Sequence, residues 1–293
     1  MDYKKIIKSQ KNRLKLAGIL WFIPSKIYLR IVYKIKAKRK LNLKKPVTFT
    51  DKQNWLKLND IHPEYTKLVD KIGVRQHLKE KLGEDICFPL LGVWEKYEDI
   101  DFDQLPNEFV LKCSHDSGSV KVIRDKKTIN HQQLRQFYKN KLGRNPYYAG
   151  REYPYKHVKP RIIAEKFMVP EGLKDIEDYK FFCFNGEPKI MFVATDRSTD
   201  CRFDFFDMNF NHLDIENIHP QSGKEFSKPP LFEEMKQLAS TLSKGMKFVR
   251  IDLYTINDKI YFGEFTFFHG GGFWPMKPES WEMKLGDWIN IKD

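Results

Sequence analysis

The stretch Phe248-Val-Arg-Ile-Asp-Leu-Tyr254, followed by Ile260-Tyr-Phe-Gly-Glu-Phe-Thr266, decides the fold. Both segments are rich in β-branched and aromatic residues, which is typical of strands. Because side chains alternate along a strand, Arg250 and Asp252 share one face and the apolar residues between them share the other. We therefore expect an antiparallel pair of strands with a charged face and an apolar face.

Glu264 is the only acid of the second segment and stands among aromatic residues. An unpaired buried carboxylate is costly, so it needs a cation. Direct pairing of Glu264 with Asp252 requires a three-residue loop at 257–259, whereas a two-residue turn at 257–258 would place the two carboxylates on opposite faces. Two interpretations remain open: an all-oxygen Mg²⁺ site with Arg250 as a phosphate clamp, or a salt bridge in which Arg250 satisfies both acids.

Further strands and helices surround this pair. Asn185-Gly186 predicts a tight hairpin turn, and the class is α+β with a largely antiparallel sheet. We expect strands at 109–113, 120–123, 161–168, 178–184, 188–195, 201–207, 247–256 and 260–268. We expect helices from Thr50 or Asp51 onward, twice between His62 and Gly83, at 131–142 and at 231–245, and an aromatic loop at 143–160.

Composition and charge describe a globular chain with a local basic segment. The 293 residues are 41% hydrophobic and 14% aromatic, which excludes wholesale disorder. The formal net charge is +13. Residues 1–45 hold 15 Lys and Arg against one acid, and the remaining 248 residues hold 37 basic and 38 acidic side chains. The basic character is therefore local, and we expect no specific nucleic-acid partner.

Residues 1–45 form a basic amphipathic arm. Lysines and arginines alternate with apolar residues, and Pro24 breaks any helix there. Two interpretations stay open: short helices lying on an anionic cytoplasmic membrane surface through Trp21, Tyr28 and Tyr33, or helices that pack on the body. The apolar run 16–23 is too short to cross a bilayer. The four cysteines show no metal-ligand spacing and indicate buried thiols, so we expect a cytoplasmic protein, with peripheral membrane attachment as an option.

A second polar constellation lies upstream. Lys112 stands in an apolar strand and directly precedes the small-residue loop Ser114-His-Asp-Ser-Gly-Ser119, whose amides could approach phosphates. Glu165-Lys-Phe-Met168 ends a later strand, and Asp178-Tyr-Lys180 begins the next. Ordered cationic and acidic positions of this kind suit a Mg-nucleotide held between two sheets.

With these residues the chain resembles the ATP-grasp superfamily, and within it the TupA-like group, named for teichuronopeptide biosynthesis. The resemblance covers about residues 46–286. Its most specific parts are Asp70-Lys71 with Arg75, Phe109-Val-Leu-Lys-Cys-Ser-His-Asp-Ser-Gly118, Lys159-Pro-Arg-Ile-Ile-Ala-Glu165, Asp178-Tyr-Lys-Phe-Phe-Cys-Phe-Asn-Gly186, Arg250-Ile-Asp-Leu-Tyr254 and Phe262-Gly-Glu-Phe-Thr266.

The resemblance implies a fold in which two α+β lobes hold the nucleotide, preceded by the basic arm. It implies domains at 1–45 (arm), 46–108 (N-terminal subdomain), 109–168 (small lobe with the phosphate loop) and 169–293 (large lobe with the metal site). It also implies roles for residues. ATP contacts fall on Lys71, Lys112, Ser114, Ser117, Gly118, Ser119, Glu165, Lys166, Phe167, Met168 and Asp178, catalytic roles on Arg250 and Lys180, and Mg²⁺ ligands on Asp252, Glu264 and Thr266.

The chain departs from the superfamily pattern at two places. Many ATP-grasp ligases have Asn two residues after the second metal-binding Glu, whereas this chain has Thr266. The number of metal ions bound, one or two, therefore stays open. The glycine-rich segment Phe267-Phe-His-Gly-Gly-Gly-Phe-Trp274 lies where relatives hold the acceptor carboxylate. It is either an anion-binding nest or a turn.

The activity that the resemblance implies is an ATP-dependent carboxylate–amine ligase. It would work through an acyl phosphate and join an amino acid or amino sugar to a uronic acid of a surface polysaccharide or its lipid-linked precursor. Two alternatives stay open: a glycan kinase or glycosyltransferase that uses the same site, and a nucleotide-binding adaptor of a membrane glycan-assembly complex.

Overall fold

The computed structural model describes residues 20–169, 176–197 and 199–291. The predicted arm residues 1–19 lie outside the described residues. The described chain forms two compact units. The first contains residues 20–22 and His62–Met168, and the second contains the described residues of Ile23–Ile61 and Val169–Asp293.

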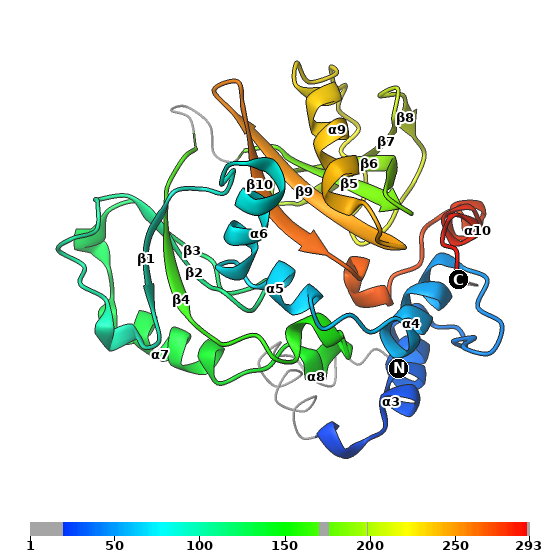
Figure 1. The fold of residues 1–293 in the computed structure, drawn as a ribbon, viewed down its shortest axis with the longest axis horizontal. Coiled ribbons are helices and arrows are strands. Elements are labelled where there is room, and N and C mark those ends of the chain that lie inside the picture. Colours follow the sequence, from blue (N-terminus) through cyan, green and yellow to red (C-terminus); the bar gives the residue numbers. More distant parts are fainter. Residues whose placement is uncertain (1–19, 170–175, 198, 292–293) are drawn as a thin grey trace. The chain divides into compact units, whose positions relative to one another are not determined.

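The first unit is built on a four-stranded antiparallel sheet in the order β1-β4-β2-β3 (Figure 1). Its strands are β1 (Leu90–Trp94), β2 (Phe109–Cys113), β3 (Lys121–Ile123) and β4 (Ile162–Lys166). Its helices are η1 (Leu20–Phe22), α5 (Tyr65–Val69), α6 (Gly73–Leu82), η2 (Tyr97–Asp99), η3 (Lys126–Thr128), α7 (His131–Leu142), α8 (Tyr147–Gly150) and η4 (Tyr153–Tyr155).

Alternation along β2 separates the core of this unit from its polar face. Phe109, Leu111 and Cys113 are buried and pack with Tyr138 of α7. Val110 and Lys112 are partly exposed and lie on the opposite face. Lys112 is therefore held on a rigid strand with its charge outside the apolar core.

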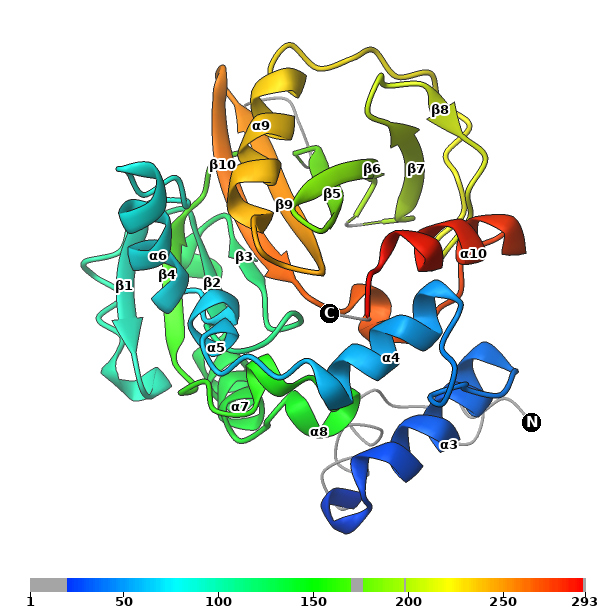
Figure 2. The same cartoon turned by 45° about the vertical axis from the view of Figure 1, so that its right-hand side comes forward.

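The second unit is built on a six-stranded antiparallel sheet in the order β10-β9-β5-β6-β7-β8 (Figure 2). Its strands are β5 (Asp178–Phe184), β6 (Glu187–Thr195), β7 (Arg202–Asp207), β8 (His212–Leu213), β9 (Phe248–Ile256) and β10 (Lys259–Thr266). Its helices are α3 (Ser25–Ala37), α4 (Phe49–Asn59), α9 (Phe232–Ser243), η5 (His269–Gly272) and α10 (Glu279–Trp288).

Different elements cover the two faces of this sheet. On one face α9 packs through Phe232 against Phe181, with ring centroids 6.0 Å apart. On the other face Phe49 of α4 packs against Phe182 and Phe248, at 6.2 and 5.1 Å. Residues two apart on a strand share a face of the sheet. Lys180, Arg250 and Asp252 therefore lie on the same face as Phe182 and Phe248, which is the face that α4 covers. The opposite face is the one that α9 covers.

Most elements agree with those expected, but the short strand β8 was not expected, and α4, the loop at 143–160 and β1 also differ. Helix α4 begins after Thr48, whose hydroxyl accepts from the Asp51 amide, so the predicted cap at Thr50 or Asp51 was wrong by two or three residues. The loop 143–160 contains the short helices α8 and η4. Strand β1 was not expected, because it is an edge strand with mostly exposed residues and no apolar alternation.

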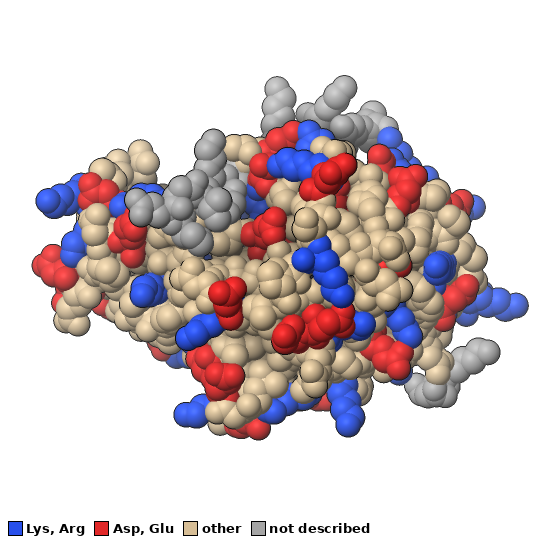
Figure 3. All heavy atoms as spheres, turned by 90° about the horizontal axis from the view of Figure 1, so that it is seen from above, with Lys and Arg blue, Asp and Glu red and all other residues tan. Residues whose placement is uncertain are grey.

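The surface and the cysteines fit a globular protein. In Figure 3 basic and acidic side chains are interspersed over the face shown, as expected for a body of nearly balanced charge. All four cysteines are free, with Cys113 and Cys183 buried and the other two half-buried. Within the described ranges, the helices are all too short or too polar to cross a membrane.

Candidate active site

Asp252 and Glu264 lie directly opposite each other on β9 and β10. The connecting turn nevertheless has only two residues, Asn257 and Asp258, with φ of 49° and 55°. The ladder starts with Ile256 opposite Lys259, and its register shifts between Phe262 and Glu264. The expectation that this pairing needs a three-residue loop was wrong, because a β-bulge supplies the missing residue.

Gly263 forms this bulge. A Cβ at this position would lie 2.8 Å from the Tyr254 ring and 3.0 Å from the Asp252 carbonyl oxygen. Only glycine therefore allows the two strands to approach so closely. The isolated glycine within a strand pattern was a signal for this bulge that our sequence analysis did not use.

Arg250 binds both carboxylates. Its Nε and Nη2 donate to the two oxygens of Asp252, each at 2.6 Å. The same Nη2 lies 3.3 Å from Glu264 Oε1 and 3.0 Å from Thr266 Oγ1. This bidentate geometry fixes the guanidinium plane over the charged face of the sheet.

Lys180 completes the group from β5. It stands opposite Asp252 in the register, donates to Asp252 Oδ2, and lies 2.6 Å from Asp178 Oδ2. Five charged side chains thus meet on adjacent strands. We call this group the carboxylate cluster: Asp178, Lys180, Arg250, Asp252 and Glu264.

Opposite charges keep Arg250 and Asp252 in their ionised forms. Burial alone would raise the pKa of Asp252, but the charges of Arg250 and Lys180 outweigh it and lower the pKa to about 2. Burial opposes the charge of Arg250, but Asp252 outweighs this effect and raises the pKa of Arg250. Arg250 and Asp252 therefore stay charged at neutral pH.

Asp178, one of the expected ATP contacts, lies within this cluster. Its Oδ2 accepts from Tyr254 Oη at 3.1 Å and from Arg197 Nη1 at 2.8 Å. Its Oδ1 is buried and has no protein partner among the described residues. The charge of Asp178 raises the pKa of Arg197. Arg197 is thus paired with a buried acid.

His269 is a cluster contact that sequence analysis did not identify. Its Nδ1 lies 2.9 Å from Arg250 Nη1, and its Nε2 lies 2.8 Å from Asn217 Oδ1. Burial and the charge of Arg250 lower its pKa well below the usual value. The neutral ring therefore accepts from Arg250 at Nδ1 and donates to Asn217 at Nε2. No motif signals this role, because His269 lies 19 residues from Arg250.

The glycine segment after His269 is held by α4. Gly270, Gly271 and Gly272 all have positive φ, between 57° and 66°. Asn54 Nδ2 donates to the Gly272 carbonyl and Lys57 Nζ to the Gly271 carbonyl, both at 2.6 Å. This segment is therefore a fixed turn whose carbonyls are bound.

In the first unit, Lys112 is paired with Glu165. Lys112 Nζ lies 2.5 Å from Glu165 Oε2, and Arg75 Nη2 lies 3.7 Å from Oε1. The next two of the expected ATP contacts, Lys166 and Phe167, have other partners. The Lys166 amide donates to the Pro89 carbonyl at 2.9 Å, and the Phe167 ring lies under Arg124 at 3.9 Å.

The predicted phosphate loop 114–119 contacts Lys71. The Lys71 amide donates to the Ser114 carbonyl at 3.1 Å, and Lys71 Nζ donates to the Asp116 carbonyl at 2.5 Å. Ser119 is buried, and its hydroxyl accepts from the Cys113 amide at 2.7 Å. Ser117 and Gly118 are exposed at the tip.

Lys141 of α7 is a further cation at this loop that sequence analysis did not identify. It donates to the Gly118 carbonyl at 2.5 Å and lies 3.8 Å from Asp116 Oδ2. The loop therefore has a lysine on each side, Lys71 and Lys141.

The predicted residues form two sets, one in each unit. The first unit holds Lys71, Lys112, Ser114, Ser117, Gly118, Ser119, Glu165, Lys166, Phe167 and Met168. The second unit holds Asp178, Lys180, Arg250, Asp252, Glu264 and Thr266.

Asp252 and Glu264 supply carboxylate oxygens, which are the ligand type that Mg²⁺ prefers. Mg²⁺ is commonly bound by one or two carboxylates together with substrate phosphates and water, so a full protein cage is not required. Such a cage is indeed missing from the described part of the chain, which has no group of three or more His, Cys, Asp or Glu side chains arranged to hold a metal ion. The Thr266 hydroxyl donates to Glu264 Oε1 at 3.2 Å.

Comparisons with known proteins identify one family. The family model described as TupA-like ATPgrasp matches residues 51–290. A search of curated proteins found no match.

Solved structures give distant matches. The D-alanine–D-alanine ligase from Bacillus anthracis is 19% identical, with 68% of this chain and 56% of that chain covered and a TM-score of 0.40. Its complex with ATP is 18% identical, with 68% and 55% covered and a TM-score of 0.39. The RimK domain protein ATP-grasp from Sphaerobacter thermophilus is 12% identical, with 77% and 69% covered and a TM-score of 0.42. The chain thus spans less than two thirds of the Bacillus anthracis ligase.

Proposed function

Because the chain belongs to the TupA-like ATP-grasp family, we propose that it is an ATP-dependent carboxylate–amine ligase. The observation that carries the proposal is the carboxylate cluster, in which Arg250 and Lys180 are held against Asp252 on the inner strands of one sheet. Buried, pre-positioned cations beside paired acids suit a site that handles a Mg-triphosphate.

The proposed reaction has two steps. A carboxylate oxygen of the acceptor attacks the γ-phosphorus of ATP, the bond to the β-γ bridging oxygen breaks, and ADP leaves. The nitrogen of an amine then attacks the acyl carbon of the acyl phosphate, loses a proton, and inorganic phosphate leaves with the former carboxylate oxygen. The products are an amide, ADP and phosphate, and water is not consumed.

The residues of the carboxylate cluster would have different roles in this reaction. Arg250 and Lys180 would bind oxygens of the transferred phosphoryl group, where positive charge stabilises the transition state. Asp252 and Glu264 would hold Mg²⁺, which when bound neutralises triphosphate charge. His269 would keep the Arg250 guanidinium in place, since Nδ1 accepts from Nη1 at 2.9 Å.

The first unit would bind the nucleotide through its own polar residues. Lys112 stands on β2 with its ammonium 2.5 Å from Glu165, and a triphosphate would offer it a second anionic partner. Lys71 and Lys141 flank the loop whose exposed tip is Ser117-Gly118, which suits contact with phosphate oxygens. The backbone of Glu165–Met168 would contact the adenine.

The family supports a proposal for the substrate class. The TupA-like group is named for teichuronopeptide biosynthesis, so we propose that the carboxylate belongs to a uronic acid of a surface polysaccharide or its lipid-linked precursor. The amine would come from an amino acid or an amino sugar.

The test is nucleotide turnover by the full chain with Mg²⁺ and a panel of uronic-acid glycans paired with amino acids, followed by mass analysis. We expect ADP release that needs both substrates, and a product whose mass is the sum of the two minus water. A product heavier by one phosphoryl group would instead identify a kinase. ATP binding without ADP release under every pairing would identify an adaptor.

A further inference from the structure

The outward face of α3 carries a row of isoleucines. Ile27, Ile31 and Ile35 are spaced by four residues and therefore lie along one side of the helix. Their exposed fractions are 50%, 49% and 46%. Single exposed apolar residues are ordinary, but a continuous row on one helix face is typical of a surface that binds something.

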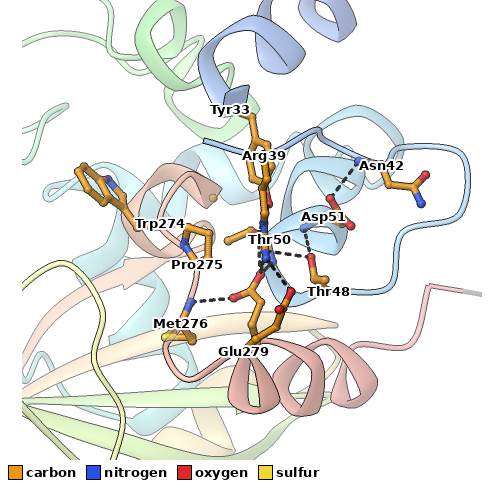
Figure 4. A network of polar contacts seen from close by, with 12 residues as sticks. Tyr33, Arg39, Asn42, Thr48, Thr50, Asp51, Trp274, Pro275, Met276 and Glu279 are labelled. Atoms are coloured by element: carbon orange, nitrogen blue, oxygen red, sulfur yellow. Dashed lines mark hydrogen bonds and ion pairs between the residues drawn. The ribbon is translucent and has the colours of Figure 1, made fainter. Parts of the chain in front are cut away.

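The opposite face of α3 is already occupied, as Figure 4 shows for Tyr33. Leu29 and Tyr33 are fully buried. Tyr33 Oη lies 2.8 Å from Thr50 Oγ1 of α4 and accepts from Arg39 Nε at 2.7 Å. Packing on α4 therefore takes up the inner side of the helix and leaves the isoleucine row outside.

An ion pair between the partly exposed Arg39 and a buried acid fixes the orientation of α3 (Figure 4). Arg39, just after the helix, donates to Glu282 Oε1 of α10 at 2.8 Å. Glu282 is fully buried and also accepts from the Thr50 amide and the Met276 amide, both at 2.8 Å. Because this network ties α3 to α4 and α10, turning the isoleucine row inward would break several buried polar contacts.

The isoleucine row is flanked by positive charge. Arg30 and Lys34 are exposed beside it, and α3 contains no acidic residue. In the sequence, residues 1–19 add six Lys and Arg against a single acid, Asp2. Trp21 and Phe22, which directly precede α3, are 66% and 65% exposed. We call Ile27, Ile31 and Ile35 with Arg30 and Lys34 the isoleucine face.

We propose that the isoleucine face binds the surface of an anionic lipid bilayer, with α3 lying parallel to the membrane. Isoleucines would enter the boundary between headgroups and acyl chains, while Arg30 and Lys34 would contact anionic headgroups. A nucleic acid would offer phosphates but no apolar phase for the isoleucines. A second copy of the chain would bring two cationic helices together. Charge complementarity therefore favours the bilayer.

The inference stands apart from the proposed activity, since α3 contributes no residue to the carboxylate cluster. Its test uses the full chain and flotation with vesicles of phosphatidylcholine alone or mixed with phosphatidylserine. The test variant is Ile27→Ser/Ile31→Ser/Ile35→Ser, and a second variant is Arg30→Gln/Lys34→Gln. The matched control is Val120→Ser/Val122→Ser, because these two residues are also about half exposed, at 53% and 50%.

We expect the natural chain to bind the mixed vesicles and to bind pure phosphatidylcholine much more weakly. The isoleucine variant should lose at least about tenfold in binding, because apolar burial scales with area. The Arg30/Lys34 variant should lose a similar factor, since each cation near an anionic surface contributes about fivefold or more. The valine control should bind as the natural chain does.

Three results would overturn the inference. The first is no binding of the natural chain to mixed vesicles. The second is unchanged binding of the isoleucine variant, which would show that the isoleucines do not enter the bilayer. The third is an isoleucine-dependent dimer in sedimentation without vesicles, which would assign the face to a second copy. ADP release with water-soluble substrates should be the same in all variants. A failure of the membrane proposal can therefore be distinguished from a failure of the ligase proposal.

Discussion

Asp252 stands directly opposite Glu264 across β9 and β10, and Gly263 makes this possible. Without the bulge, the two-residue turn at 257–258 would send the carboxylates to opposite faces of the sheet. With it, a single guanidinium, that of Arg250, contacts both acids. The pairing of the acids thus depends on a residue without a side chain.

The first prediction concerns this bulge. Gly263→Ala should force the strands apart or shift the register, because the new methyl group would lie 2.8 Å from the Tyr254 ring. We expect a loss of about 1–3 kcal/mol in the free energy of unfolding and loss of ADP release. Chemical denaturation measures the first effect. Gly143→Ala is the control, because a Cβ there has an ordinary contact at 3.5 Å; equal stability of both variants would contradict the prediction.

The second prediction concerns the acids. Asp252→Asn and Glu264→Gln keep the side-chain shapes but remove the charges proposed to hold Mg²⁺. Each should lower ADP release by at least about 100-fold while circular dichroism shows an unchanged fold. Glu187→Gln is the control, since Glu187 lies exposed on β6 of the same sheet and pairs only with Lys189 among the contacts described. Full activity of either test variant would remove the proposed metal site.

The third prediction concerns Lys112. Replacing it with Met should weaken ATP binding by about 10- to 100-fold, because a charge-assisted contact to phosphate is lost. Lys121→Met on the neighbouring strand β3 serves as the control. Calorimetric titration with ATP measures both. Unchanged affinity of the Lys112 variant would mean that Lys112 serves only to neutralise Glu165.

The fourth prediction concerns pH. His269 stays neutral in the folded protein, because burial and Arg250 lower its pKa well below the ordinary 6.5. In the unfolded chain it gains a proton below about pH 6.5, so its contribution to stability is full above that pH and is lost as the pH falls. The titration of Asp252 does not change the stability in this pH range, because its pKa is 3.8 in the unfolded chain and about 2 in the folded protein.

Removing the His269 titration should therefore flatten the pH dependence of stability. His77 and His115 also have lowered pKa values because of burial and remain in any variant. The difference between the natural chain and His269→Asn should be a slope of up to about 1.4 kcal/mol per pH unit between pH 6 and about pH 5. His62→Asn, on the surface, is the control. Identical slopes for the natural chain and the His269 variant would show that His269 is not held neutral.

The sequence predicted most of the sheet and the members of both polar groups, because alternation and charge are local properties. Arg250 and Asp252 share a face by the period of a strand alone. The register between β9 and β10 was not predictable in this way, since it depends on a bulge. His269 and Lys141 were missed because their contacts come from the tertiary fold and follow no spacing rule. The helix α3 was expected either to pack on the body or to lie on a membrane; its two faces differ, and the inner face packs on α4.

The most direct test of the ligase follows the oxygen atom. The acceptor carboxylate is labelled with ¹⁸O and incubated with the full chain, Mg²⁺, ATP and the amine that supports ADP release. If an acyl phosphate forms, one labelled oxygen must leave with inorganic phosphate, and phosphate heavier by one ¹⁸O is the predicted result. Release of unlabelled phosphate together with an amide product, or retention of all the label in a phosphorylated glycan, would contradict the account.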